Sequence, residues 1–181
     1  MKTLILLRHA KSSWDDPDLE DHDRPLNKRG RGAAPVIAAW LAERGHVPDR
    51  IVCSSSLRTQ ETVERMRDAL PDLPDPVIEP GLYHADPARM MELVRAQPDE
   101  ANGVMLVGHQ PGLSAFARML AGGKVRPGCS RAFEHFPTAA AAVLTAQTEI
   151  WADIAPRTAR FVEFAKPREL ADRGAVAKSG A

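Results

Sequence analysis

Short runs of apolar residues alternate along this chain with longer segments whose apolar residues recur every three or four positions. Runs of the first kind predict buried strands, and segments of the second kind predict helices with one buried face. The predicted strands cover residues 3–7, 50–55, 76–80, 103–108, 139–146 and 159–164, and the predicted helices cover 33–45, 59–70, 87–96 and 112–120. Because strands and helices alternate, and the strands lack polar alternation, the pattern favours a mostly parallel α/β sheet covered on both faces.

Local signals set the helix boundaries. Asp86 and Pro87 combine an N-cap residue with proline at the first helical position, so a helix begins there. Gly122 and Gly123 end the helix that Pro111 opens. Pro35 lies within the apolar pattern of the first helix, which we therefore expect to begin late or to kink at that residue.

The organisation is that of one domain followed by a short tail. With 181 residues the chain is long enough for a single substantial core, and no repeat or long linker divides it. We expect a domain over residues 1–170 and a disordered tail over 171–181, where no periodicity is visible.

Composition narrows the possible partners and the cellular location. Lys plus Arg and Asp plus Glu both number 24, so the formal net charge is zero, which disfavours binding to nucleic acid or to an anionic membrane. Cys53 and Cys129 provide neither a disulfide framework nor a metal-binding spacing. The apolar run 4–7 is too short for a signal peptide, and no run could span a bilayer. We therefore expect a cytoplasmic monomer.

Candidate chemistry lies where three of the predicted strands end. The first strand ends in Arg8 and His9, the second leads to Arg58, and the fourth leads to His109. In a parallel sheet these ends meet at one edge, where ligands bind. Two guanidinium groups match phosphate oxygens, and the following helix N-termini add amide donors. The pattern therefore predicts a pocket for a phosphoryl group.

The two histidines indicate what happens to that phosphoryl group. A neutral imidazole is a competent nucleophile, and His9 is the better candidate because it sits at the strand end. His109 is placed to stabilise charge on a phosphoryl oxygen during transfer. The chain shows no carboxylate cluster suited to Mg²⁺ and no Walker-type loop, so we expect phosphoryl transfer without a metal or cofactor.

The segments "LLRHAKSS", "SSSLRTQET" and "VGHQPGL" together resemble the histidine phosphatase superfamily, also called phosphoglycerate mutase-like. The segment "DHDRPLNKRG" narrows the resemblance to phosphohistidine phosphatases of the SixA type, over about residues 2–166. This resemblance implies a three-layer sandwich with a six-stranded, mostly parallel sheet and no cofactor. It also implies that His9 becomes phosphorylated and that Arg8, Arg58 and His109 complete the phosphate pocket.

One feature departs from the pattern of larger members of that superfamily, which carry an acidic general acid after the third strand. Here "GLYHAD" places His84 at that position, while Glu79 and Asp86 are near it in sequence but off the motif. Cleavage of phosphohistidine expels imidazole, whose conjugate acid has a pKa of roughly 6.5, so it needs less acid assistance than an alkoxide. The departure therefore favours a P–N substrate.

Further candidates for substrate contact are Ser12, Arg24 and His84, and His84 is equally well explained as a rim residue. The functional hypothesis is a metal-independent protein phosphohistidine phosphatase. A phosphatase or mutase of a small phosphorylated metabolite is the alternative within catalysis. A non-catalytic phosphate-binding adaptor is the alternative of another class, which the presence of a nucleophile disfavours.

Overall fold

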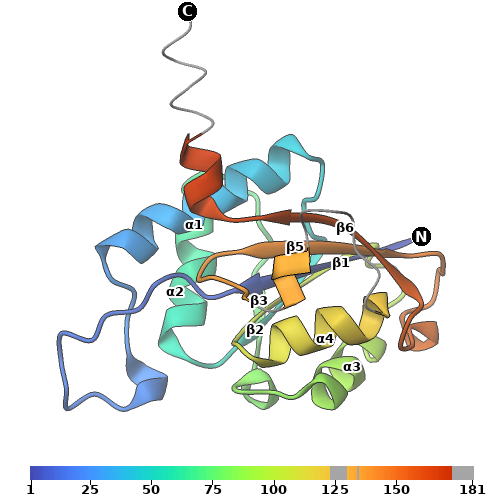
Figure 1. Cartoon of the computed structure of the whole chain (residues 1–181), viewed down its shortest axis with the longest axis horizontal. Helices are drawn as coiled ribbons and strands as arrows, with labels where there is room; N and C mark the ends of the chain where they lie inside the picture. The colour runs from blue at the N-terminus through green and yellow to red at the C-terminus, as the bar shows by residue number, and fades with distance from the viewer. Residues whose placement is uncertain (123–129, 134, 173–181) are drawn as a thin grey trace, which may run out of the picture.

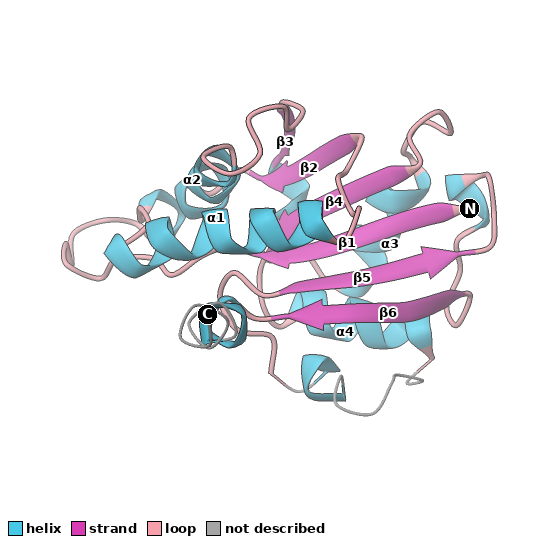
Figure 2. Ribbon diagram, turned by 90° about the horizontal axis from the view of Figure 1, so that it is seen from above, coloured by secondary structure: helices cyan, strands magenta, loops and turns pink. Residues whose placement is uncertain are grey.

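A computed structural model describes residues 1–122, 130–133 and 135–172 (Figure 1). The strands are β1 (Lys2–Arg8), β2 (Arg50–Ser54), β3 (Pro76–Glu79), β4 (Gly103–Gly108), β5 (Ala141–Ala146) and β6 (Ala159–Ala165). These six strands form a single sheet in the order β3-β2-β4-β1-β5-β6 (Figure 2). All six lie where the hydrophobic pattern predicts them.

The strand pairing is mostly parallel. β1 pairs with β4, β4 with β2, and β2 with β3, all in parallel. β5 joins β1 antiparallel, and β6 joins β5 antiparallel. The carboxyl ends of β1, β2 and β4 therefore lie at one edge of the sheet, as the predicted site requires.

Helices cover both faces of the sheet and make three layers (Figure 2). Helices α1 (Lys28–Glu43) and α2 (Leu57–Met66) lie on one face, and α3 (Pro87–Arg95) and α4 (Gly112–Ala121) lie on the other. The predicted α/β three-layer sandwich is confirmed.

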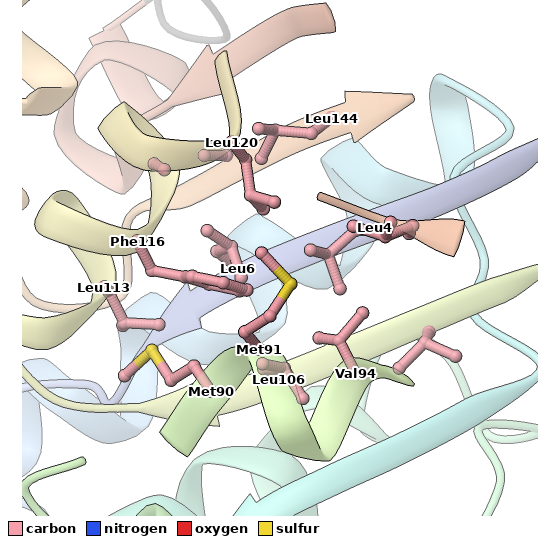
Figure 3. Close-up of a cluster of buried hydrophobic side chains, with 14 of the residues drawn as sticks. Leu4, Leu6, Met90, Met91, Val94, Leu106, Leu113, Phe116, Leu120 and Leu144 are labelled. Atoms are coloured by element: carbon pink, nitrogen blue, oxygen red, sulfur yellow. The ribbon is translucent and has the colours of Figure 1, made fainter. Parts of the chain in front are cut away.

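Strand β1, near the centre of the sheet, is buried on both faces because its side chains alternate between two hydrophobic cores. Leu4 and Leu6 pack with side chains of α3 and α4, including Phe116, in the cluster that Figure 3 shows. Ile5 and Leu7 point to the opposite face and pack with α1 and α2. This arrangement explains why the strand reads as an unbroken apolar run.

The largest differences between the predicted and observed helix boundaries are at the start of α1 and at the end of α2. α1 begins at Lys28 and runs through Pro35, because Asn27 caps it by accepting a hydrogen bond from the Gly30 N–H at 2.9 Å. Pro35 lies inside the helix, so the alternative that the helix begins late is wrong. α2 ends at Met66, earlier than predicted. The Asp86 cap of α3 is confirmed, since its side chain accepts from the Arg89 N–H.

At the end of the chain, residues 167–172 are helical, so the first two residues of the predicted tail are ordered as helix. The rest of that tail, Gly123 and Cys129 lie outside the described residues. Cys53 is fully buried in the α1–α2 core, as a small core residue would be. No helix in the described ranges is long and apolar enough to cross a membrane.

Candidate active site

The four predicted residues come together in one pocket of about 300 Å³ at the carboxyl edge of the sheet. Arg8 ends β1 and His9 follows it, Arg58 lies in the first turn of α2, and His109 follows β4. The residues that line the pocket are Arg8, His9, Lys11, Ser12, Trp14, Asp21, Arg24, Arg58, His84, His109, Gln110 and Thr138. The predicted convergence, including Ser12, Arg24 and His84, is therefore observed.

His9 is held in one orientation by the backbone around it. Its Nδ1 donates to the carbonyl oxygen of Ala10 at 2.7 Å, and its own N–H donates to the carbonyl oxygen of Gly108 at 3.1 Å. Burial and the positive charges of nearby arginines, Arg58 foremost, lower the pKa of His9 to about 3. The imidazole is thus neutral at neutral pH, and Nε2 keeps its lone pair for attack.

His109 faces His9 across the pocket, with the two ring centroids 5.2 Å apart. The Oγ of Ser54 lies 2.8 Å from His109 Nε2, so Nδ1 is the nitrogen that remains for a ligand. Burial, together with the neighbouring His9 and Arg58, lowers the pKa of His109 to about 2. Arg58 Nη2 lies 3.5 Å from that Nδ1, which places a guanidinium and an imidazole on the same side.

Arg8 has unused hydrogen-bonding capacity. Its Nη1 donates to the carbonyl oxygen of Phe136 at 2.8 Å, which fixes the guanidinium. Its buried Nε has no partner among the described residues. Burial and the charge of Arg58 lower the pKa of Arg8. An anion would supply both the missing acceptor and the compensating charge.

The loop 12–27 adds a third guanidinium to the pocket. Arg24 is 6% exposed and donates to Ser12 Oγ at 2.7 Å and to the Ser13 carbonyl oxygen at 2.9 Å. The exposed ring of Trp14 covers the Arg24 guanidinium at 3.2 Å from the ring centroid. Ser12 and Arg24 thus hold each other at the pocket wall.

Asp21 is a pocket residue that the sequence reasoning missed, because it lies in an acidic run that is typical of a solvated loop. Its carboxylate accepts from Arg24 Nη1 and Arg58 Nη2, each at 2.9 Å, and from the Tyr83 hydroxyl at 2.7 Å. The Tyr83 hydrogen bond and those of the two arginines hold the pKa of Asp21 well below its usual range. The one sequence feature that could have identified Asp21 is its position three residues before Arg24, with which it pairs.

His84 stands at the rim, with 58% of its side chain exposed. Its ring stacks on Tyr83 at 4.1 Å and meets His109 edge to face at 5.3 Å, while its Nε2 lies 3.7 Å from the Asp21 carboxylate. Glu79 accepts from the Gly81 N–H and Asp86 caps α3, so both have structural partners away from the pocket. Of the three residues considered near the motif, His84 alone lines the pocket.

Comparisons with known proteins show the family to which the chain belongs. A family model described as the histidine phosphatase superfamily (branch 1) matches residues 4–87. An uncharacterised protein of Mycobacterium tuberculosis is 35% identical over 164 residues, which are 90% of this chain and 100% of that protein. A structure assigned as phosphohistidine phosphatase SixA from Agrobacterium tumefaciens is 32% identical, with a TM-score of 0.74, over 92% of this chain and 99% of that one. The chain belongs to the histidine phosphatase superfamily.

Two further solved SixA structures are similar to this histidine phosphatase. A SixA structure from Nakamurella multipartitia is 30% identical, with a TM-score of 0.77, and covers 92% of this chain and 96% of that one. A protein histidine phosphatase SixA complexed with tungstate is 23% identical with a TM-score of 0.76, a likeness that shows the shared fold. The family match and the SixA structures together identify the chain as a phosphatase and so disfavour the non-catalytic adaptor.

Proposed function

We propose that this chain is a metal-independent phosphatase of phosphohistidine in proteins, acting as a cytoplasmic monomer through a phospho-His9 intermediate. The observation that carries the proposal is a neutral, oriented imidazole enclosed by three guanidinium groups. His9 keeps Nε2 free because Nδ1 is bound to Ala10, and Arg8, Arg24 and Arg58 line the same pocket.

The reaction takes place in two displacements at phosphorus. In the first, His9 Nε2 attacks the phosphoryl group, a P–Nε2 bond forms, and the P–N bond to the substrate imidazole breaks. In the second, a water molecule attacks the same phosphorus and the P–Nε2 bond breaks, with its electron pair returning to Nε2. Inorganic phosphate leaves with the oxygen and both protons of that water. His9 returns to its neutral form, and the Ala10 carbonyl keeps its orientation in both steps.

Arg8, Arg58 and His109 stabilise the negative charge on the phosphoryl oxygens during transfer. Arg8 and Arg58 offer permanently charged donors, and the unpaired Arg8 Nε gains a phosphoryl oxygen as its acceptor. A bound phosphoryl dianion raises the pKa of the neighbouring His109, so its Nδ1 can donate to an equatorial oxygen when charge develops there.

The carboxylate in the pocket favours a substrate whose leaving group needs no strong acid. Asp21 is the one acidic residue among the described lining residues, and its depressed pKa keeps it ionised at neutral pH. It therefore has no proton to give to an alkoxide. Imidazole leaves without a strong acid, and His84 at the open rim is the group placed to protonate it. A phosphohistidine substrate fits this arrangement better than an alkyl phosphate.

The test is a quench of the enzyme during turnover, followed by mapping of the label, with matched substrates. During hydrolysis of a phosphohistidine peptide, alkaline quenching should trap an acid-labile phosphate on His9. The His9→Ala variant should lose both the label and turnover. The same peptide with phosphoserine should have a kcat/KM lower by about 10²–10⁴, the usual worth of general-acid assistance. Both rates should survive EDTA.

Three results would contradict the proposal at different points. Label on a serine would overturn the intermediate, and activity restored by Mg²⁺ or Zn²⁺ after chelation would reveal a metal site. Faster turnover of sugar phosphates or phosphoglycerate than of the phosphohistidine peptide would assign the enzyme to small metabolites.

A further inference from the structure

A second hollow, which we name the basic groove, adjoins the catalytic pocket. It has a volume of about 510 Å³ and lies between α1, the segment that precedes β5, and the residues that follow β6. Its lining residues are Lys11, Arg29, Gly32, Ala33, Val36, Pro137, Thr138, Lys166, Pro167, Arg168 and Ala171. Lys11 and Thr138 line the catalytic pocket as well, so the two hollows share a wall.

The charged residues that line the basic groove are all positive. Lys11, Arg29, Lys166 and Arg168 line it, and no acidic residue does among the described residues. Lys166 pairs with Glu169 at 2.6 Å, outside the lining. The other three cations form no ion pair or side-chain hydrogen bond within the described part of the chain. Since the whole chain has no net charge, this concentration of cations is local.

The rest of the lining is small and apolar, and it contains no aromatic ring. Ala33, Val36, Pro137 and Pro167 provide surfaces that suit aliphatic side-chain stems and a polypeptide backbone. A single-stranded nucleic acid would need aromatic platforms for base stacking, which the described lining lacks. The groove is also larger than the catalytic pocket, so one small anion would leave most of it empty. An acidic polypeptide segment fits both the charge and the lining.

The loop 12–27, which contributes Ser12, Trp14, Asp21 and Arg24 to the catalytic pocket, is rich in acidic residues. It carries Asp15, Asp16, Asp18, Glu20 and Asp23 in addition to the pocket residue Asp21. An acidic substrate segment would therefore be attracted to the basic groove and repelled by this loop.

We propose that the basic groove binds an acidic segment that flanks the phosphorylated residue of a protein substrate. This inference rests on the proposed function for the nature of the substrate. Binding there orients the substrate so that its phosphoryl group enters the catalytic pocket past Lys11 and Thr138. The groove thus contributes to selection of the substrate, while the chemistry remains with His9 and its neighbours.

The test compares the flanks of synthetic peptides. The probes are peptides of equal length that carry one phosphohistidine between either Asp and Glu or Ala and Gln residues, with a parallel pair that carries phosphoserine. We expect kcat/KM to be roughly tenfold higher for the acidic flank at low salt, and the preference to shrink as salt is added. In the double variant Arg29→Glu with Arg168→Glu, the preference should vanish or reverse.

A control at a remote arginine tests whether the effect of charge reversal is local to the basic groove. Arg160 is exposed near the start of β6, beside Thr145, at the opposite edge of the sheet from the active site. Arg160→Glu should keep the acidic preference. Both variants should hydrolyse p-nitrophenyl phosphate at the wild-type rate, because Arg29, Arg168 and Arg160 do not line the catalytic pocket.

The outcomes distinguish this inference from the proposed function. If phosphoserine peptides are cleaved as fast as phosphohistidine peptides, the proposed function fails. The comparison of acidic with neutral flanks still tests whether the basic groove binds acidic segments. If neither peptide is cleaved, their affinity for His9→Ala, measured by fluorescence anisotropy, gives the same comparison. Equal values for acidic and neutral flanks, a preference that survives charge reversal, or stronger inhibition by an oligonucleotide than by an acidic peptide would each overturn the inference.

Discussion

At the scale of single residues, Asp21 connects the loop 12–27 to the phosphate-binding arginines. It pairs with Arg24 on its own loop and with Arg58 on α2, and Tyr83 adds a third hydrogen bond from the segment after β3. Because the Asp21 pKa is strongly depressed, the carboxylate remains an acceptor at any pH where the enzyme would work. We therefore assign it the role of a positioning residue, not of a proton donor.

Replacing Asp21 by Asn should lower kcat/KM mainly through KM, because Arg24 and Arg58 lose the charge that holds them at the pocket. The loss should be smaller than that of Arg58→Ala, which removes a phosphate donor and should cost about 10²–10³ in kcat/KM. Steady-state kinetics with a small phosphorylated substrate measure both.

The control for this variant is Asp23→Asn, which removes a carboxylate that is 64% exposed and pairs only with His22 among the described side chains. It should leave kcat/KM unchanged. An increase in kcat/KM for Asp21→Asn would show instead that Asp21 competes with the phosphoryl group for the two arginines.

At the scale of elements, the first turn of α1 packs directly on the chain that follows the nucleophile. Gly30 lies against Lys11, two residues after His9, and the Asn27 N–H donates to the Lys11 carbonyl oxygen at 2.9 Å. A Cβ added at Gly30 would overlap that carbonyl and lie 2.9 Å from the Lys11 nitrogen. The helix thus helps to set the position of His9.

Gly30→Ala should therefore destabilise the protein and lower kcat, although alanine usually stabilises a helix interior by roughly 0.5–1 kcal/mol relative to glycine. Thermal unfolding and turnover of a small substrate measure the two effects. Gly32→Ala is the matched control, since a Cβ there has nothing within 4 Å. It should stabilise the protein or leave it unchanged with full activity. Equal stability and equal turnover of the two variants would contradict a role of α1 in positioning His9.

At the scale of the whole molecule, folding places two neutral histidines in the interior beside arginines. The pKa of His9 falls from 6.5 to about 3 and that of His109 to about 2, chiefly through burial. Between pH 6.5 and these values the unfolded chain binds protons that the folded chain does not. The free energy of unfolding must therefore fall as pH is lowered through this window.

Chemical denaturation at pH 7, 6, 5 and 4 should show this loss of stability, with each buried histidine contributing at most about 1.4 kcal/mol per pH unit. The His109→Gln variant should show a shallower decline, because one of the two groups is gone. The exposed His135, replaced by Gln, should leave the slope as in the wild type. A slope unaffected by His109→Gln would mean that this histidine is protonated in the folded protein.

Local patterns in the sequence determined the elements and the core of the site. Buried strands read as apolar runs whatever their partners are, and helix caps such as Asp86 act through residues a few positions away. Arg8, His9, Arg58 and His109 could be found because each follows directly on a strand, and parallel strand ends must meet at one edge. The earlier start of α1 shows the limit of such local prediction. Its first turn is held by contacts of Asn27 and Gly30 with the Lys11 backbone, which is distant in sequence.

Only the tertiary structure decided which loop residues enter the pocket and which surfaces adjoin it. Asp21 and Arg58 are 37 positions apart, and no local pattern distinguishes Asp21 from the other acidic residues of its loop. The basic groove likewise combines Lys11 and Arg29 with Lys166 and Arg168, from opposite ends of the chain. The physical reason is that charges interact through space, so their partners are set by how the loops fold back on the sheet and not by their spacing in the chain.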